Sequence, residues 1–261
     1  MTNSFTDKEL IAERWMLDPA LFAEGCRLLA ADGLARGQGI GTLREKSVHR
    51  VLKYCCNPFA DGQEVSIGGY VADVVGEQGV MEIQSAQFGR LRDKLAAFLP
   101  CCPVTIIWPA EADRWLCNLS PEGELLSRRR SPRHQKPQHL FEELYPIREW
   151  LTHPGLRIRI VLLETEEYRL PRKGRKTLRC DRVPLQMLGQ LALDCPADYG
   201  QLLPDTLTGR FGARETARAC GIDLNTSRMM LRILCQLGIL TEDGKEGRRL
   251  MFRRTDSPSE T

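Results

Sequence analysis

The 261-residue sequence contains no apolar run approaching the roughly 18 residues that a membrane-spanning helix needs. Its N-terminus also lacks the basic-then-apolar pattern of a secretory signal peptide. We therefore expect a soluble, cytoplasmic protein that has no membrane partner. The net charge is only +3, so the binding of any polyanion must depend on local clusters of basic residues.

The ten cysteines lack a metal-binding arrangement, because no two of them are spaced as C-x-x-C. Two pairs of them, Cys55 with Cys56 and Cys101 with Cys102, are adjacent in the sequence, and most of the others occupy apolar-patterned positions. Adjacent pairs and core positions are typical of reduced thiols in an intracellular protein. The spacing therefore favours core packing over a zinc site or a disulfide framework.

Residues 69–84 have the pattern of a β-hairpin. Two runs rich in β-branched and apolar residues, 69–75 and 80–84, flank a short turn that contains glycine. Each run carries one acid among apolar neighbours, Asp73 in the first and Glu82 in the second. A carboxylate buried there is costly unless it is paired, and two converging acids commonly share a divalent cation such as Mg²⁺ or Mn²⁺. Clustering also raises the pKa of at least one carboxyl group.

A helix with a further acid precedes this hairpin. Residues 43–53 carry apolar side chains at helical spacing, and Glu45 and His49 lie one turn apart. A glutamate in the first turn is favoured by the helix dipole, and Glu45 with His49 also fits an ordinary pair at i and i+4. Glu45 can therefore have either a structural role in the helix or a functional role as a site residue.

The order of helix with Glu, strand with Asp and strand with Glu-x-Gln resembles the PD-(D/E)XK nuclease superfamily over roughly residues 40 to 110. The resemblance implies a restriction-endonuclease-like αβββαβ core. It further implies that Asp73, Glu82 and the carbonyl of Ile83 bind Mg²⁺ or Mn²⁺, and that Glu45 is the acid on the first helix. We expect Asp73 and Glu82 on adjacent strands, with Glu45 directed to the same cleft.

Gln84 stands where this superfamily usually has lysine. A glutamine can hydrogen-bond and orient a water, but it brings no positive charge. The catalytic set that the resemblance implies is therefore Glu45, Asp73, Glu82 and Gln84, with Lys94 on the following helix as a substitute cation. A carboxylate-held metal would supply both a nucleophilic water and a charge sink for the scissile phosphate.

Further elements of this core follow from apolar spacing. The sequence predicts an amphipathic helix over 85–99, a buried strand over 104–108, a strand pair near 115–117 and 124–126, a helix over 141–151 and a strand over 156–163. We place a nuclease-like domain at 41–165, after an N-terminal helical extension at 1–40. Residues 255–261 are expected to be a disordered tail.

Two basic runs, 128–136 and 169–182, follow the predicted core. Such clusters are the electrostatic footprint of binding to a phosphate backbone. Pro171, Gly174 and the lack of apolar periodicity equally favour a solvated, flexible segment. We therefore predict a basic linker over 166–200. Its expected DNA contacts are Arg172, Lys173, Arg175 and Lys176.

Residues 201–254 resemble a winged helix-turn-helix. A short helix over 213–220 ends at Gly221, and Asp223 is a plausible N-cap for a second helix over 225–237. A hairpin with a turn at 242–247 completes the pattern. The resemblance implies that outward residues face the major groove or the phosphates of DNA, namely Asn225, Thr226, Arg228, Arg232, Lys245 and Arg248. Protein contact or dimerisation is the alternative use of this module.

The sequence as a whole thus predicts an α/β protein, with a restriction-endonuclease-like αβββαβ core plus a small winged-helix domain. The favoured function is DNA binding with metal-dependent phosphodiester hydrolysis. One alternative is a non-catalytic DNA-binding or regulatory protein that keeps a degenerate nuclease fold as a scaffold. Another is a protein-interaction module, and a homodimer also remains open.

Overall fold

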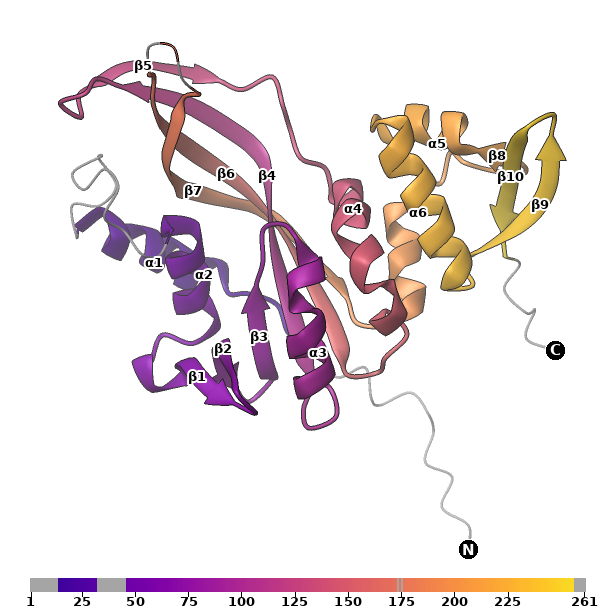
Figure 1. Ribbon diagram of the computed structural model, residues 1–261, viewed down its shortest axis with the longest axis horizontal. Helices are drawn as coiled ribbons and strands as arrows, with labels where there is room; N and C mark the ends of the chain where they lie inside the picture. Colours follow the sequence, from indigo (N-terminus) through magenta and orange to yellow (C-terminus); the bar gives the residue numbers. More distant parts are fainter. Residues whose placement is uncertain (1–13, 32–45, 173, 175, 256–261) are drawn as a thin grey trace, which may run out of the picture.

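The computed structural model describes residues 14–31, 46–172, 174 and 176–255 of the chain. These residues form a mixed α/β structure, in which helices lie against both faces of a large sheet (Figure 1). A smaller segment of two helices and a hairpin lies beyond the helices on one face. Within these residues, no helix is long and apolar enough to cross a membrane.

The large sheet has the strand order β1-β2-β3-β4-β6-β7, and β5 pairs with the far half of β4. β1 to β3 form an antiparallel meander, β4 is parallel to both β3 and β6, and β7 returns antiparallel to β6. The strands are β1 (Gln63–Ile67), β2 (Tyr70–Gly76), β3 (Gly79–Ile83), β4 (Val104–Leu119), β5 (Leu125–Arg130), β6 (Leu156–Leu170) and β7 (Leu178–Leu193).

The predicted hairpin over 69–84 is confirmed as β2 and β3. Its turn requires glycine, because Gly79 has φ +92° and a Cβ there would lie 2.3 Å from the carbonyl oxygen of Pro103. With α2 (Ser47–Cys56) before the meander and α3 (Arg92–Phe98) between β3 and β4, the chain follows the expected order of one helix, three strands, one helix and one strand.

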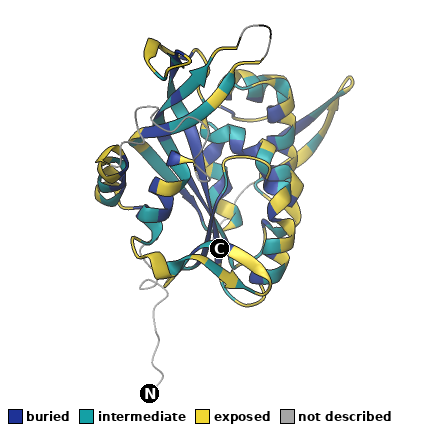
Figure 2. Cartoon of the chain, turned by 60° about the vertical axis from the view of Figure 1, so that its left-hand side comes forward, coloured by how far each residue is buried: buried dark blue, intermediate teal, exposed yellow. Residues whose placement is uncertain are grey.

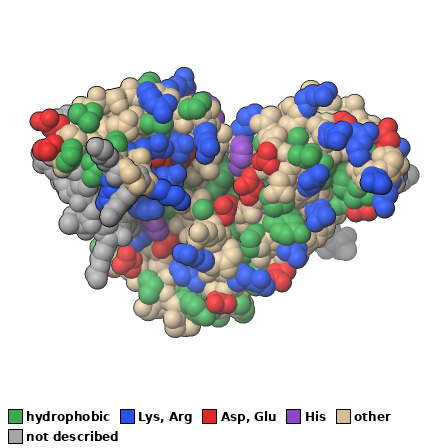
Figure 3. All heavy atoms as spheres, turned by 45° about the horizontal axis from the view of Figure 1, so that its top comes forward, with side chains coloured by type: hydrophobic (Ala, Val, Ile, Leu, Met, Phe, Trp, Pro, Cys, Tyr) green, Lys and Arg blue, Asp and Glu red, His purple; other side chains and the backbone are tan. Residues whose placement is uncertain are grey.

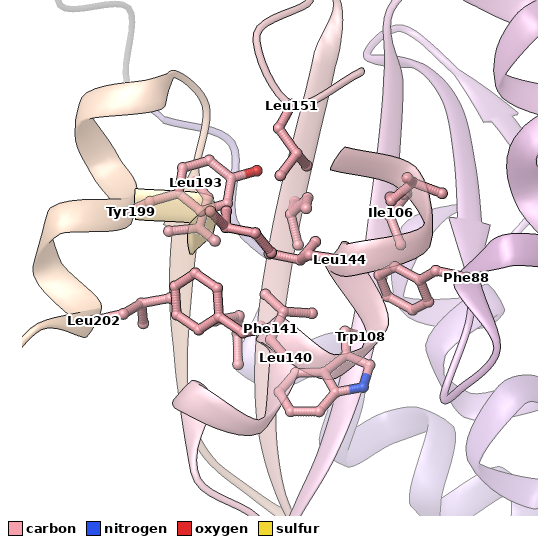
Figure 4. Close-up of a cluster of buried hydrophobic side chains, with 14 of the residues drawn as sticks. Phe88, Ile106, Trp108, Leu140, Phe141, Leu144, Leu151, Leu193, Tyr199 and Leu202 are labelled. Carbon is pink, nitrogen blue, oxygen red and sulfur yellow. The ribbon is translucent and has the colours of Figure 1, made fainter. Parts of the chain in front are cut away.

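Two hydrophobic clusters hold the helices on opposite faces of the sheet. α1 (Pro19–Ala31) and α2 pack over one face, on residues such as Met81 and Leu163. On the other face, α3, α4 (Leu140–Leu144) and short 3-10 turns pack around Trp108 and Phe141 (Figure 4). Buried residues follow the inner strands, and exposed ones cover the outer helix surfaces (Figure 2). Each large apolar side chain buried in this way contributes roughly 1.5–3 kcal/mol. The 3-10 turns are η2 (Ala60–Gly62), η3 (Phe88–Leu91), η4 (Pro137–His139), η5 (Tyr145–Trp150) and η6 (Pro196–Leu202).

The C-terminal segment packs directly on this second cluster. Met230 and Leu231 of α6 are buried in the same cluster as Phe141 of α4 and Tyr199 of η6, so the sheet body and the C-terminal segment share one core. The segment contains a three-stranded sheet, in which β10 lies between β8 and β9. Its elements are β8 (Phe211–Gly212), α5 (Ala213–Cys220), α6 (Leu224–Gln236), β9 (Leu240–Glu246) and β10 (Arg249–Arg254).

The junction between α5 and α6 has the predicted capping. Gly221 ends α5 in the left-handed conformation, at φ +60°. The carboxylate of Asp223 then accepts hydrogen bonds from the backbone N–H groups of Asn225 at 2.8 Å and Thr226 at 3.1 Å. These bonds satisfy donors that the first turn of α6 would otherwise leave unpaired.

The prediction of a flexible basic linker over 166–200 is wrong. Most of this segment belongs to β6 and β7, which pair antiparallel along most of their length, and Pro171 and Gly174 lie in the turn between them. Both arginines of β7, Arg179 and Arg182, pair with Glu167 of β6, and Arg182 is its cross-strand partner. Opposite charges on paired strands stabilise a sheet, which apolar periodicity alone does not reveal.

Two predicted helices are shorter in the structure. The helix expected over 85–99 begins only after Gln87, which has φ +61°, and the helix expected over 141–151 is broken into 3-10 turns near Pro146. Residues 1–13 of the N-terminal extension, residues 32–45 with Glu45, and residues 256–261 of the expected tail lie outside the described residues.

Candidate functional site

Asp73 and Glu82 lie opposite each other at the point where β2 and β3 separate. The backbone ladder between these strands ends at Val74 and Met81. Beyond it, side-chain carboxylates accept the hydrogen bonds between the strands. Asp73 Oδ2 accepts the backbone N–H of Ile83 at 2.8 Å, and Glu82 Oε1 accepts the backbone N–H of Asp73 at 3.4 Å. The two acids are thus on adjacent strands, as expected, and each one bonds to the backbone of the other strand.

Glu82 is the more deeply buried of the two acids, with 3 % of its side chain exposed. Its Oε2 accepts a hydrogen bond of 2.7 Å from Nζ of Lys94 on α3. Burial and the neighbouring charge of Asp73 raise the pKa of Glu82 to about 6, although Lys94 acts in the opposite direction. A raised carboxyl pKa in this cluster agrees with the sequence-based expectation.

Asp73 has the opposite electrostatic balance. Burial favours its neutral form, but the imidazole of His49 lies 3.4 Å from Oδ2, and the N–H of Ile83 also stabilises the charge. Together these groups hold the pKa of Asp73 below its usual value. Asp73 is therefore ionised at neutral pH.

The backbone at the end of β3 turns a carbonyl toward Asp73. The N–H of Gln84 donates to the carbonyl of Ile107 on β4 at 3.0 Å, whereas the N–H of Ile83 points the other way, to Asp73. Because the N–H and C=O of one strand residue point to the same side, the Ile83 carbonyl also faces β2. The side-chain amide of Gln84 donates to the carbonyl of Ala86.

Asp73, Ile83 and Gln84 line a cleft of about 410 Å³ between α2 and the sheet, whereas Glu82 is turned to Lys94 and does not line it. It opens into a groove of about 850 Å³ that runs toward the α5–α6 turn, and Figure 3 shows the molecule hollowed between the sheet body and the C-terminal segment. Basic side chains on this path are Lys46, Lys53, Arg90, Arg114, Arg133 and Arg182.

The donor chemistry at the end of β3 suits a hard divalent cation. Asp73 supplies an ionised carboxylate at the cleft, and the Ile83 carbonyl faces the same side; Mg²⁺ and Mn²⁺ prefer such oxygen ligands. Glu82 lies beside them, but its carboxylate is held by Lys94. Within the described parts of the chain, no three His, Cys, Asp or Glu side chains are arranged to hold a metal. Glu45, the third expected acid, lies outside those parts.

Comparison with known proteins places the sheet and the cleft in one family. The model of the family described as "Domain of unknown function (DUF8091)" matches residues 46–194, from the start of α2 to the end of β7. The chain belongs to this family. A Treponema pallidum (strain Nichols) protein titled "Uncharacterized protein" is 28% identical over 221 residues, which cover 82% of this chain and 87% of that protein. No solved structure matches the chain.

The C-terminal candidates lie after the DUF8091 match. Asn225, Arg228, Arg232, Lys245 and Arg248 are exposed. Three of these arginine side chains line a hollow of about 270 Å³ between α6 and the β9–β10 hairpin, namely Arg228, Arg232 and Arg248.

The outward orientation predicted for Thr226 is wrong. Thr226 is fully buried, and its hydroxyl lies within hydrogen-bond distance of carboxylate oxygens of Asp223 and of Glu142 on α4. It therefore joins the C-terminal segment to the DUF8091 domain. At the β6–β7 turn, Arg172 and Lys176 are exposed, whereas Lys173 and Arg175 lie outside the described residues.

Sequence reasoning missed several side chains that line the DUF8091 cleft, among them Lys46, Glu111, Thr165 and Arg182. Lys46 directly precedes the first residue of α2, so a better estimate of the helix start would have indicated it. Arg182 was counted only as part of a basic run. The acid Glu167 in β6, which lies opposite Arg182 of β7, was the available signal for a paired strand.

Proposed function

We propose that this DUF8091 protein binds DNA and hydrolyses its phosphodiester bonds with Mg²⁺ or Mn²⁺ in the cleft beside α2. The observation that carries the proposal is that Asp73 and Glu82 bond across the point where β2 and β3 separate, with Asp73 and Ile83 at the cleft. The order from α2 to β4 supports a restriction-endonuclease-like core, and the α5–α6 pair with its hairpin supports a winged-helix module.

The residues divide the chemistry between them. A bound divalent ion would supply a water that is nucleophilic at neutral pH and a sink for negative charge. Asp73 contributes a permanent charge and the Ile83 carbonyl a neutral oxygen. Glu82, with a pKa of about 6, can change its protonation state close to neutral pH. Gln84 lies at the same cleft and can orient a water by hydrogen bonding.

The DNA path follows the basic groove from the cleft to the α5–α6 turn. Duplex or structured DNA suits this path, because the exposed face of α6 presents Asn225, Arg228 and Arg232 to a major groove. Lys245 and Arg248 are exposed on the hairpin that follows α6, and they would add phosphate contacts. A cytoplasmic location and self-association stay predictions.

A second candidate is a non-catalytic DNA-binding protein that uses the nuclease-like core as a scaffold. The pairing of Lys94 with Glu82 favours it, because an internal cation already balances the buried acid. Gln84 in place of the superfamily lysine favours it as well. Metal binding separates the two candidates.

The deciding experiment is calorimetric titration of the full chain with Mn²⁺, followed by incubation with plasmid DNA in Mg²⁺. We expect wild type to bind one ion, and Asp73→Asn and Glu82→Gln to weaken binding at least about tenfold, which is about 1.4 kcal/mol. Glu77→Gln is the matched control, because Glu77 is an exposed acid in the β2–β3 turn.

Three other outcomes assign the alternatives. Equal Mn²⁺ affinity in wild type and both variants would reject Asp73 and Glu82 as ligands. DNA binding with strong salt dependence but without metal binding or cleavage would support the scaffold function. Absence of both DNA and metal binding would leave a protein-interaction module.

A further inference from the structure

Arg182 projects from β7 into the same cleft that holds Asp73. It lines both the cleft and the adjoining basic groove, and 28 % of its side chain is exposed. Its Nη1 lies 2.5 Å from Glu111 Oε1, and its Nε lies 3.6 Å from Glu167 Oε2. Two acids thus hold the guanidinium in place at the wall of the cleft, while part of its surface stays open.

The acids that hold Arg182 are outnumbered by the cations around them. Glu167 is fully buried and is also paired with Arg114 at 3.3 Å, with Arg179 at 3.6 Å and with Arg169. Glu111 is paired with Arg114 at 2.8 Å. Among the described residues, this cluster combines two carboxylates with four guanidinium groups. The cluster therefore carries more positive than negative charge, and its Arg182 side chain lines the cleft.

A second cation stands at the start of α2. Lys46 is exposed and lines both the cleft and the groove. Its neighbour Ser47 bonds to the carboxylate of Asp181, with the backbone N–H at 3.2 Å and through its hydroxyl. Because Asp181 directly precedes Arg182, this contact fixes the start of α2 against the strand that carries Arg182.

The cleft also contains an unused hydrogen-bonding group. Thr165 on β6 is fully buried and lines the cleft, and its hydroxyl has no hydrogen-bond partner within the described part of the chain. A buried hydroxyl without a partner costs free energy. A ligand oxygen in the cleft would remove that cost.

We propose that Arg182, Lys46 and Thr165 form a phosphate-binding subsite beside Asp73 that takes a phosphodiester group of a polynucleotide. This inference rests on the proposed function, because it names the groups that hold the substrate in the same cleft. A phosphate offers several acceptor oxygens to a guanidinium fork and an ammonium at once. The subsite supplies the positive charge that Gln84 does not bring.

The test measures binding of pyrophosphate to the full chain in EDTA, so that neither metal nor hydrolysis is needed. We expect Arg182→Gln and Lys46→Gln to weaken the binding by tenfold or more, and Arg182→Lys to recover part of it. Arg179→Gln is the matched control: Arg179 is on the same strand and faces the same Glu167, but it does not line the cleft. Its affinity for pyrophosphate should equal that of wild type.

A parallel arm uses a fluorescent 12-base-pair duplex in the same buffer, and the same two glutamine variants should weaken its binding. Loss of pyrophosphate binding without loss of duplex binding would overturn the polynucleotide assignment in favour of free phosphate compounds. Wild-type pyrophosphate affinity in Arg182→Gln, or no binding by wild type, would overturn the subsite. If Arg182→Gln does not fold, Lys46→Gln decides, because Lys46 is exposed.

The two proposals fail in different ways. Wild type that cleaves DNA in Mg²⁺, together with Arg182→Gln and Lys46→Gln that cleave and bind equally well, would reject the subsite and keep the nuclease function. Pyrophosphate and duplex binding that depend on Arg182, in a protein that never cleaves DNA, would keep the subsite and reject the nuclease function.

Discussion

Nζ of Lys94 donates a 2.7 Å hydrogen bond to Oε2 of Glu82, and so brings a cation from α3 to the most buried acid of the candidate site. Asp73 approaches the same glutamate through its backbone N–H. The site therefore already contains a cation, because Lys94 pairs with Glu82, while the imidazole of His49 lies beside Asp73. Any cation that binds there must compete with Lys94 for Glu82.

This arrangement predicts how stability depends on pH. The pKa of Glu82 is about 6 in the folded protein, above its ordinary value of 4.5. The folded state therefore holds its proton more tightly, and the free energy of unfolding falls as pH rises from about 4.5 through 6. Glu82→Gln should flatten this fall by an amount on the order of 2 kcal/mol. Urea unfolding at pH 4.5 and pH 7 measures it.

An exposed acid supplies the control for that experiment. Glu149 pairs with Arg92 at the surface, and Glu149→Gln should leave the difference between the two pH values unchanged, because exposed pairs contribute little. A Glu82→Gln protein with the same pH dependence as wild type would show that Glu82 is not held in this raised state.

The face of α6 predicts two opposite mutant phenotypes. Arg228 is exposed, so Arg228→Ala should leave stability within about 0.5 kcal/mol of wild type while it reduces preference among DNA sequences by about 1–3 kcal/mol. Thr226 is buried against Glu142, so Thr226→Ala should lower the free energy of unfolding by about 1–3 kcal/mol. Thermal unfolding and DNA titrations separate the two effects. Undiminished sequence preference in Arg228→Ala would assign α6 to protein contact.

The turn between β6 and β7 predicts a change that is independent of DNA sequence. Neutralising Arg172 and Lys176 should weaken binding to all duplexes and flatten the salt dependence by roughly one unit for each lost phosphate contact. Both side chains are exposed, so the fold should be unaffected. DNA titrations over a range of salt concentrations measure the slope. An unchanged slope would mean that this turn does not reach DNA.

The sequence predicted those parts of the fold whose signal is local. The alternation around Asp73 and Glu82 and the glycines of the turn indicate β2 and β3, because a strand period of two and a tight turn leave a short-range pattern. The capping of α6 by Asp223 is equally local. The pairing of β7 with β6 depends instead on contacts between residues that are distant along the chain, such as Glu167 with Arg182, and a basic run does not reveal its partner.

The candidate site divides in the same way. Asp73 and Glu82 are visible in the sequence because an acid among apolar residues is unusual, whereas Lys46 and Arg182 are ordinary surface-type residues until the fold brings them to one cleft. The sequence predicts an exposed Thr226 because threonine is polar, but its spacing from the apolar residues of α6 indicates a buried position. It lies four residues before Met230 and seven before Ile233, on the buried side of the helix.

The shared core of the sheet body and the C-terminal segment has a geometric consequence. Met230 and Leu231 of α6 are buried in the same cluster as Phe141 and Trp108. The helix is therefore packed on the sheet body and is not joined to it through a flexible linker alone. Because of this shared core, the distance from Asp73 to the exposed face of α6 is fixed. If the cleft hydrolyses DNA and α6 binds bases of the same duplex, as we propose, each cut should fall at a set number of base pairs from those bases.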